Sequence, residues 1–346
     1  MRVYRMIRML GVVVAAAAMV GTSARRLEAQ SMTTNPFRPI VSWGELPEGR
    51  TWGSTSAVDI APDGNIWVVE RCGANTCVGS NVDPVLLFNK EGKLVRSFGS
   101  GRFAWPHGIA VDGGGNVWVT DAWAEGATTT GHVVYKFSPS GELLMTIGEP
   151  GKRGDPPQRL TRPSDVLIAP NGEIYIVEAH DQSQNRITKW AADGTYIETW
   201  GEAGYGPKQF RDPHALAMDS QGRLFVGDRY NNRIQIFDQT GKFLAIWTQF
   251  GRPSGIFIDK NDRIYVADSE SSPAPDEYMG MRNAGWEKGI RIGDARTGWV
   301  HHFIPDDRVN VTGYSGPEGI AVDDEGNLYG AEVTQRRVVK WVRFRP

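Results

Sequence analysis

The chain has 346 residues, of which 40% are hydrophobic, and a formal net charge of −2 at pH 7. It is therefore long enough to bury a large core, and its length alone would allow two domains. A charge this close to zero gives no reason to expect nucleic acid or an anionic membrane surface as a partner.

The first 30 residues differ in composition from the rest of the chain. Several arginines precede an apolar run from Met9 to Val20, and small residues follow it. This order is typical of a cleaved secretory signal peptide, and the run is too short to span a membrane comfortably. No cysteine follows the run to carry a lipoprotein anchor. We therefore predict a periplasmic or secreted protein without a membrane anchor, with residues 31–36 as a polar tether and 37–346 as the folded domain.

Two cysteines, Cys72 and Cys77 in "RCGANTC", are the only ones in the chain. Because an exported protein meets an oxidising compartment, we predict a disulfide between them. Two free thiols in a loop are the alternative interpretation. One cysteine pair cannot by itself complete a tetrahedral zinc site.

A repeated pattern organises the remainder of the chain. Each copy has an apolar strand, a turn and a second apolar strand with an aromatic residue, which is a hairpin signal. Further apolar segments follow, such as "HVVYKF" and "ELLMTIG" in the second copy. The six turns with their second strands read "APDGNIWVVE", "DGGGNVWVTD", "APNGEIYIVE", "DSQGRLFVGD", "DKNDRIYVAD" and "DDEGNLYGAE". Six such copies predict an all-β, six-bladed β-propeller of four-stranded antiparallel blades.

The sixth copy stops at "RRVVKWVRFRP" and has no fourth strand of its own. Near the other end of the chain, "RPIVSWGELP" at 38–47 is similar to "TYIETWGEAG", the fourth strand of the third copy. We therefore predict that the N-terminal strand Ile40 to Trp43 completes the last blade and closes the ring. Closure removes an exposed sheet edge and makes the propeller a single domain.

One matched position lies at the start of the innermost strand of each blade. It reads Ser56, His107, Ser164, His214, Ser254 and Glu318. Alternate blades of a six-bladed ring are about 120° apart, so side chains from blades two, four and six converge on the channel axis. We predict that His107, His214 and Glu318 bind one divalent metal, zinc first, with iron or manganese as other candidates. The competing interpretation is two solvated histidines and an ordinary surface acid.

Three more residues follow the second strands of their blades and are expected near the same mouth. Arg71 and Arg229 occupy one alignment column, and His180 comes one position later in its blade. An arginine can bind a substrate carboxylate in a bidentate fashion, and a histidine can act as acid or base near neutral pH. We predict catalytic or substrate-binding roles for all three. A surface ion pair for each arginine and an exposed loop position for His180 are the alternatives.

Other histidines and the long insertions carry weaker signals. His301 and His302 are adjacent on a strand and point to opposite faces, so we read them, and His132, as structural. The insertion "DAWAEGATTTG" follows the second strand of blade two, and "SESSPAPDEYMGMRNAGWEKG" lies in blade five. A lid and a partner contact are both open interpretations of these insertions.

The "GIAVD…GNVWVTD…VVYKF" pattern is similar to the NHL-repeat family of six-bladed propellers over essentially the whole mature chain. Within the propellers the chain resembles the peptidyl-α-hydroxyglycine α-amidating lyases, which cleave a hydroxyglycine N–C bond to give a peptide amide and glyoxylate. Those enzymes hold zinc with three histidines, with a Tyr and Arg nearby. The resemblance implies metal ligation by His107 in "WPHGIAVD" and His214 in "DPHALAMD", and substrate-site roles for Arg71 and Arg229.

Three positions depart from the lyase pattern. Glu318 stands where the family has its third histidine ligand, and His180 stands where it has its catalytic tyrosine. Gly319 replaces an aspartate that helps to hold a structural calcium in the family, so the resemblance does not extend to that ion.

The sequence therefore predicts an exported, metal-dependent, lyase-like enzyme that acts on a small or peptide-like substrate bearing a carboxylate. We expect a monomer. The principal alternative is a non-catalytic NHL propeller that binds a protein or a small ligand, because one propeller fold hosts many functions. A gluconolactonase-type enzyme is a weaker alternative, since its Glu, Asn and Asp metal ligands are not matched across the blades here.

Overall fold

The computed structural model describes residues 35–181, 184–272, 275–276, 280–307 and 316–344. The signal peptide predicted for residues 1–30, and residues 31–34 of the tether, lie outside the described residues. Within these described ranges, no helix is both long and apolar enough to cross a membrane.

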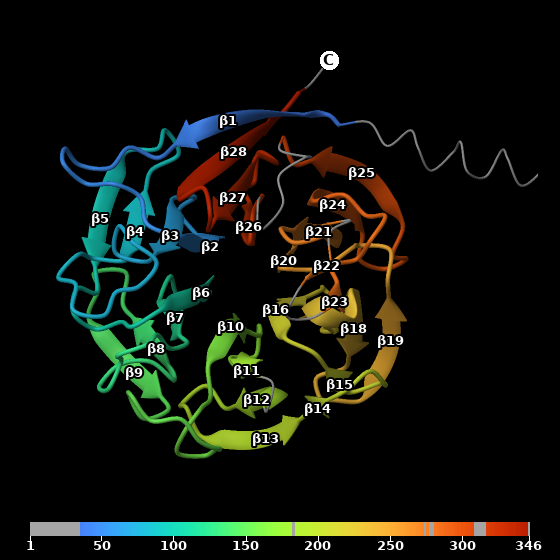
Figure 1. Ribbon diagram of the computed structural model, residues 1–346, viewed down its shortest axis with the longest axis horizontal. Helices are drawn as coiled ribbons and strands as arrows, with labels where there is room; N and C mark the ends of the chain where they lie inside the picture. The colour runs from blue at the N-terminus through green and yellow to red at the C-terminus, as the bar shows by residue number, and fades with distance from the viewer. Residues whose placement is uncertain (1–34, 182–183, 273–274, 277–279, 308–315, 345–346) are drawn as a thin grey trace, which may run out of the picture.

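Six four-stranded antiparallel sheets surround a central axis, which confirms the predicted six-bladed propeller (Figure 1). Within each blade the strands run outward from the axis in chain order, except that the last blade takes its outer strand from the N-terminus. Blade one comprises β2 (Thr55–Ile60), β3 (Ile66–Glu70), β4 (Val85–Phe88) and β5 (Leu94–Phe98). Blade two comprises β6 (Pro106–Val111), β7 (Val117–Asp121), β8 (Val133–Phe137) and β9 (Leu143–Ile147). Blade three comprises β10 (Pro163–Ile168), β11 (Ile174–Asp181), β12 (Gln184–Trp190) and β13 (Tyr196–Trp200). Blade four comprises β16 (Pro213–Met218), β17 (Leu224–Asp228), β18 (Arg233–Phe237) and β19 (Phe243–Trp247). Blade five comprises β20 (Gly255–Ile258), β21 (Arg263–Asp268), β24 (Gly289–Asp294) and β25 (Val300–Pro305). Blade six comprises β26 (Gly319–Val322), β27 (Leu328–Glu332), β28 (Arg337–Arg343) and β1 (Phe37–Trp43).

The N-terminal strand closes the ring as predicted. Strand β1 pairs antiparallel with β28, with Ile40 opposite Lys340 and Trp43 opposite Val338. The paired segment begins earlier than predicted, at Phe37. The two strands lie side by side at the top of Figure 1, so the first and last strands of the propeller share one sheet.

The hydrophobic core is divided among the gaps between neighbouring blades. One cluster joins blades one and two, where Trp67 and Val69 pack with Val119 and Tyr135. Another joins blades three and four through Tyr175, Trp200 and others. Because both faces of a blade are covered by its neighbours, second strands such as β3 and β7 are buried along their whole length. The outer strand β5, in contrast, is exposed or half-buried throughout.

A buried acid lies at or near the end of the second strand of every blade. These acids are Glu70, Asp121, Glu178, Asp228, Asp268 and Glu332, and none is more than 2% exposed. Asp121 accepts backbone N–H groups of Ala104 and Trp105, and Glu178 accepts the N–H of Thr161. The acids of the first five blades thus hold the segment that enters the innermost strand of the same blade. This arrangement makes one mouth of the channel rigid, because buried carboxylates with several donors keep those donors in place.

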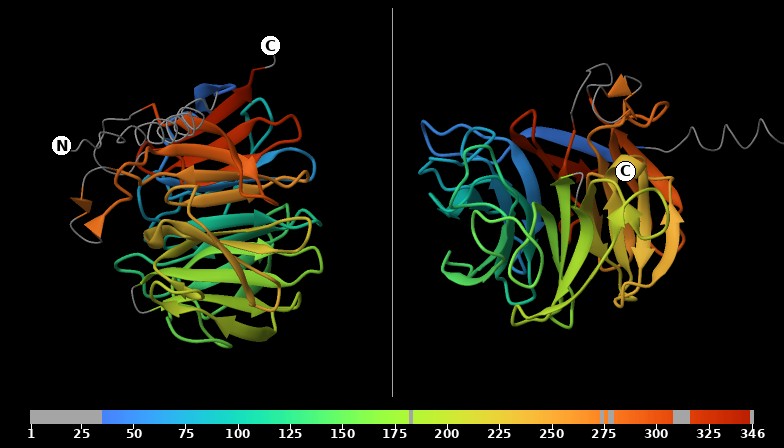
Figure 2. Two further views of the ribbon diagram at one scale, coloured as in Figure 1. Left: turned by 90° about the vertical axis from the view of Figure 1, so that its right-hand side faces the viewer. Right: turned by 60° about the horizontal axis from the view of Figure 1, so that its bottom comes forward.

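The irregular segments gather around the ring. Cys72 and Cys77 form the predicted disulfide in the segment after β3. A short helical turn, η1 (Arg229–Asn231), follows β17, and a two-stranded parallel pair, β14 (Glu202–Ala203) with β15 (Gln209–Phe210), precedes blade four. Strands β22 (Pro275–Asp276) and β23 (Gly280–Met281) form a hairpin that stands out from one face of the ring (Figure 2). This hairpin connects a second to a third strand, so it rises on the face where the innermost strands begin.

Candidate metal centre

The innermost strands aim His107 and His214 at the channel axis. Both side chains are only 3% exposed. In each case the strand pairing shifts register at the histidine, between Pro106 and Ile109 in blade two and between Pro213 and Ala215 in blade four. Such a β-bulge adds a residue to one strand and redirects its side chain. His107 and His214 therefore lie where a bulge redirects the first residues of β6 and β16.

Backbone carbonyls from the intervening blades orient both imidazoles. His107 Nδ1 lies 2.7 Å from the Ser164 carbonyl oxygen, and His214 Nδ1 lies 2.6 Å from that of Ser254. A carbonyl oxygen only accepts hydrogen bonds, so each Nδ1 carries the proton and donates it. The Nε2 atom of each neutral ring then keeps its lone pair and faces the axis, which is the arrangement of a metal-ligating histidine.

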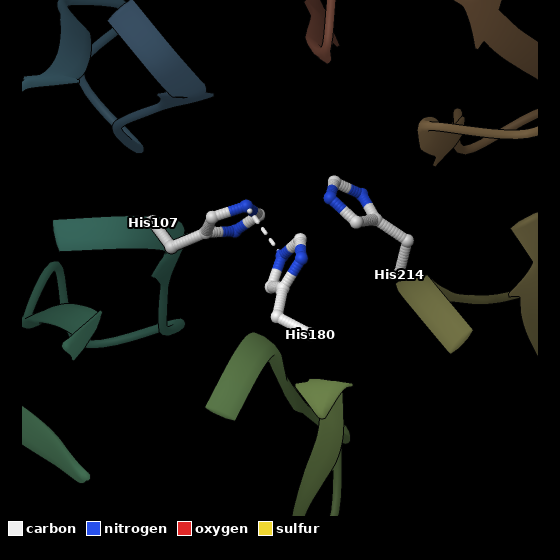
Figure 3. A group of neighbouring side chains, drawn as sticks. All are labelled: His107, His180 and His214. Carbon is white, nitrogen blue, oxygen red and sulfur yellow. Dashed lines mark hydrogen bonds between the residues drawn. The ribbon is translucent and has the colours of Figure 1, made fainter. Parts of the chain in front are cut away.

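His180 joins the two channel histidines from strand β11 of blade three. Its Nε2 lies 3.0 Å from His107 Nε2, and its ring centroid is 4.7 Å and 5.0 Å from those of His107 and His214. The three rings converge from three separate strands (Figure 3). One ligand atom from each of the three lies within 4.8 Å of the others. The predicted acid–base residue is thus placed among the candidate metal ligands.

Glu318 completes the group from blade six. Its Oε1 atom lies 3.2 Å from His107 Nε2 and 3.1 Å from His214 Nε2. Burial opposes ionisation of this carboxyl, but its contacts with His107 and His214 outweigh that effect and hold its pKa well below the usual range. Burial also lowers the pKa of His107 to about 4, against the opposing influence of Glu318. A neutral imidazole and an ionised carboxylate are the forms that bind metals.

These distances fit one divalent cation. A tetrahedral zinc with ligands at about 2.0–2.1 Å separates them by about 3.3 Å from one another. The contacts of 3.0, 3.1 and 3.2 Å among these four side chains are close to that value. In addition, His214 Nε2 is buried and makes no hydrogen bond of good geometry, although Glu318 Oε1 lies 3.1 Å away, so its lone pair is available to a cation. His107, His180 and His214 could therefore reach one metal ion together, with Glu318 in contact with two of them.

Arg71 lies beside this group and is 1% exposed. Its Nε donates to the Pro106 carbonyl at 3.3 Å and its Nη1 to Asn75 Oδ1 at 2.7 Å, while the guanidinium carbon lies 3.6 Å from the Trp105 ring centroid. Its Nη2 is buried without a hydrogen-bond partner. Burial lowers the pKa of Arg71 to about 10, with Glu318 opposing the shift, so the side chain stays cationic at neutral pH. An unsatisfied buried cationic donor is costly unless a ligand pairs with it.

Arg229, in contrast, has its donors engaged by protein carboxylates. It pairs with Asp212 through Nε and Nη2, and its Nη1 lies 3.1 Å from Glu270 Oε1. Asp212 also accepts the backbone N–H of His180 at 2.8 Å. Burial opposes ionisation of Asp212, but the charge of Arg229 prevails and keeps its pKa far below the usual value. These contacts favour a role for Arg229 in positioning His180 through Asp212.

Sequence reasoning missed several residues of the site. Asp212 and Trp105 occupy the column directly before the Pro-His pairs, so their position could have drawn attention. Glu270 follows β21 at the start of an insertion, where no repeat marks it. The histidines predicted to be structural, His132 and the pair on β25, are not in the three-histidine group found among the described residues.

Comparison with known proteins places the chain among NHL-type propellers. The family model described as "NHL repeat" matches residues 103–125 and 210–237, and a model described as "Strictosidine synthase-like, N-terminal" matches residues 307–333. The chain is 34% identical to human NHL repeat-containing protein 3 over 242 residues, which cover 67% of this chain and 66% of that protein. It is 29% identical to peptidyl-α-hydroxyglycine α-amidating lyase 2 of Drosophila melanogaster over 217 residues, which cover 57% of this chain and 50% of that protein.

The matched segments thus span 66% and 50% of these relatives' own lengths. Among solved structures, a gluconolactonase from Xanthomonas campestris superposes with a TM-score of 0.57 at 14% identity, covering 90% of this chain and 92% of that one. At this identity the likeness concerns the fold alone.

Proposed function

We propose that this six-bladed propeller of NHL repeats, which resembles the peptidyl-α-hydroxyglycine α-amidating lyases, is a metal-dependent carbon–nitrogen lyase. The observation that carries the proposal is the convergence of three imidazoles and one carboxylate at one mouth of the channel, with an unsatisfied arginine beside them. The proposed substrate is an N-acyl-α-hydroxyglycine with a free carboxylate. Cleavage of its C–N bond gives a primary amide and glyoxylate.

The proposed metal ligands are His107, His180 and His214, with Glu318 against two of them. Relative to the lyase pattern, Glu318 stands at the position of the third histidine ligand, and His180 stands at the position of the catalytic tyrosine. The third histidine of this site therefore comes from blade three, and blade six contributes a carboxylate. Zinc is proposed first, and the same ligand types suit iron or manganese. A divalent ion held here would polarise the substrate hydroxyl and make its proton easier to remove.

The chain's own side chains would carry the remaining steps. Arg71 offers Nη2 to the substrate carboxylate and thereby fixes the carbon that bears the hydroxyl. Glu318 is placed to accept the hydroxyl proton, because its carboxylate faces the histidines and its side chain is 14% exposed at the mouth. As the proton leaves, the C–O bond becomes a carbonyl and the C–N bond breaks. The same proton then passes to the departing amide nitrogen, so atoms and charge balance.

One ion pair and one hydrogen bond support this arrangement from behind His180. Arg229 binds Asp212, and Asp212 holds the backbone N–H of His180. His180 adopts a left-handed backbone conformation, with φ of +57°, which is uncommon for a residue other than glycine. The Asp212 hydrogen bond stabilises that conformation and so presents the imidazole to the axis.

The first test is metal content of the mature protein beside a His107→Ala/His214→Ala double variant. About one transition metal per chain, lost in the double variant, together with glyoxylate release from N-acyl-α-hydroxyglycines, would support the proposal. Wild-type protein that takes up no metal when metal is supplied would contradict it, and a ligand-binding propeller would then be the better interpretation. Metal binding without glyoxylate release would retain the site and reject the lyase reaction.

The cellular setting belongs to the same proposal. We propose that the protein is exported, because the N-terminal arginines and the apolar run from Met9 to Val20 have the order of a signal peptide. We further propose that it is a monomer. Cleavage of that segment and the mass of the purified protein in solution test these two points.

A further inference from the structure

A pocket of about 390 Å³ opens directly beside the candidate metal centre. Trp105, Trp123 and Arg162 line it together with His180, and Asn75 and Thr76 of the disulfide loop lie along its edge. The two tryptophans are half-buried, so their rings are partly available to a ligand. The pocket and the metal centre share His180, which makes the pocket an extension of the proposed reaction site.

Trp105 forms the wall nearest the metal centre. Its backbone N–H donates to Asp121 at 2.7 Å, so the buried acid at the end of β7 holds it in place. The guanidinium of Arg71 lies over its ring at 3.6 Å, and the His180 ring meets it edge-on at 5.3 Å. A substrate whose carboxylate is bound by Arg71 would therefore lie next to Trp105.

Trp123 forms the far wall and comes from the insertion that follows the second strand of blade two. The Arg162 guanidinium lies 4.9 Å from its ring centroid, and the His132 ring lies 6.5 Å away at an interplanar angle of 23°. The base of the insertion is closed by hydrogen bonds from Ala122 N–H to the Trp105 carbonyl, at 3.1 Å, and from His132 N–H to the Ala122 carbonyl, at 2.8 Å. The tryptophan is thus positioned by the blade and does not depend on the exposed tip of the insertion.

Arg162 connects Trp123 to the backbone of His180. It donates through Nη1 to the backbone carbonyl of His180 while its guanidinium covers Trp123. Its charge is therefore partly used by the protein, and Glu125 lies at the exposed rim. What remains for a ligand is mainly indole surface with one cationic face, a combination that favours a planar aromatic group over a charged or aliphatic one.

We propose that this pocket binds an aromatic side chain or acyl group attached to the amide nitrogen side of the substrate, and that Trp123 determines this preference. The identity of the substrate in this inference rests on the proposed lyase function. The preference for an aromatic group rests on the residues that line the pocket. Trp123 belongs to the insertion "DAWAEGATTTG", a sequence that no other blade shares, so the preference is a property of blade two of this chain.

The test compares kcat/KM for N-benzoyl-α-hydroxyglycine and N-acetyl-α-hydroxyglycine. The wild type is expected to prefer the benzoyl substrate, and Trp123→Ala to lower the rate on that substrate about tenfold while leaving the acetyl substrate nearly unchanged. Trp123→Phe is expected to keep most of the preference. Trp299→Ala, at an exposed tryptophan beside β25, is the matched control and should change neither rate. Equal loss on both substrates, or no loss on either, overturns the proposal.

A binding measurement separates failure of the pocket from failure of the reaction. Benzamide, the amide product of the benzoyl substrate, is titrated into wild type and Trp123→Ala by calorimetry. Binding that is lost in the variant supports the pocket even if neither hydroxyglycine is cleaved. If wild-type protein does not bind benzamide, the pocket assignment is wrong whatever the protein catalyses.

Discussion

His107 Nε2 and His180 Nε2 lie 3.0 Å apart, although 73 residues separate the two histidines in the chain. Because His107 uses its Nδ1 proton on the Ser164 carbonyl, its Nε2 has a lone pair and no proton when the ring is neutral. The short contact is then satisfied by an N–H of His180 or by a cation between the two rings. Two ligand sets are therefore to be compared by experiment: the three histidines His107, His180 and His214, or His107 and His214 with Glu318.

The contribution of His180 to metal binding is testable by comparing His180→Ala with Glu318→Gln. If the three histidines hold the metal, His180→Ala should weaken metal affinity by about 100-fold or more, because a ligand is removed. Glu318→Gln should keep most of the metal and lose most of the activity. Metal affinity is measured by competition with a chromophoric chelator, and His301→Ala, at an exposed position, is the control. Normal metal affinity in His180→Ala with loss of metal in Glu318→Gln would instead favour the set His107, His214 and Glu318.

Arg71 should select for a carboxylate on the substrate. Arg71→Ala is expected to raise KM about tenfold or more for a substrate with a free carboxylate, and to have little effect on the methyl ester of the same substrate. The reason is that Nη2 is the one buried donor of this side chain without a protein partner. Arg296→Ala removes an exposed arginine paired with Asp294 and serves as the control. A similar loss on acid and ester would point to a packing role on Trp105 in place of carboxylate binding.

Asp165 should make the protein less stable as the pH rises toward neutrality. This side chain faces the central channel, and burial raises its pKa from 3.8 to about 7, with Asp59 contributing in the same direction. The folded state therefore retains a proton that the unfolded state loses near pH 4, and the associated stability disappears between about pH 4 and 7. Asp165→Asn is expected to match the wild type at pH 4 and to exceed its stability at pH 8 by up to about 4 kcal/mol.

Urea unfolding at several pH values measures this difference. Asp193→Asn is a useful comparison, because hydrogen bonds from Thr195 lower the pKa of that exposed turn carboxyl. Its removal should cost stability above about pH 4 and not below, which is the opposite sign. A stability difference between wild type and Asp165→Asn that does not vary with pH would show that the carboxyl is ionised throughout, as expected if a cation occupies the channel.

Ring closure should depend on Trp43 and not on the exposed face of the same strand. Trp43 is buried, with its ring centroid 4.9 Å from Tyr329 and 5.6 Å from Phe88, so it joins blade six to blade one. Trp43→Ala is expected to lower the free energy of unfolding by about 3 kcal/mol. Ile40→Ala, at a position 47% exposed on the same strand, should change it by less than about 0.5 kcal/mol. Comparable small effects at both positions would show that β1 contributes little to closure.

The sequence by itself determined the propeller, its closure and the positions of His107, His214 and Glu318. A repeat that occurs six times places one alignment column at equal angles around one axis, so the convergence of alternate blades follows from counting residues. The closing strand was recognisable for a similar reason, since its sequence resembles the outer strand of another blade.

Only the tertiary structure decided how the remaining residues join this column. His180 reaches the candidate metal centre through a left-handed backbone conformation, and its N–H is bound by Asp212 of the next blade. Arg229 pairs with Asp212 within blade four and with Glu270 of blade five. The pocket beside Trp105 arises from the insertion of blade two, whose sequence no other repeat shares. Repeat periodicity specifies what recurs in every blade, whereas side-chain contacts between unlike loops depend on the packing of the whole ring.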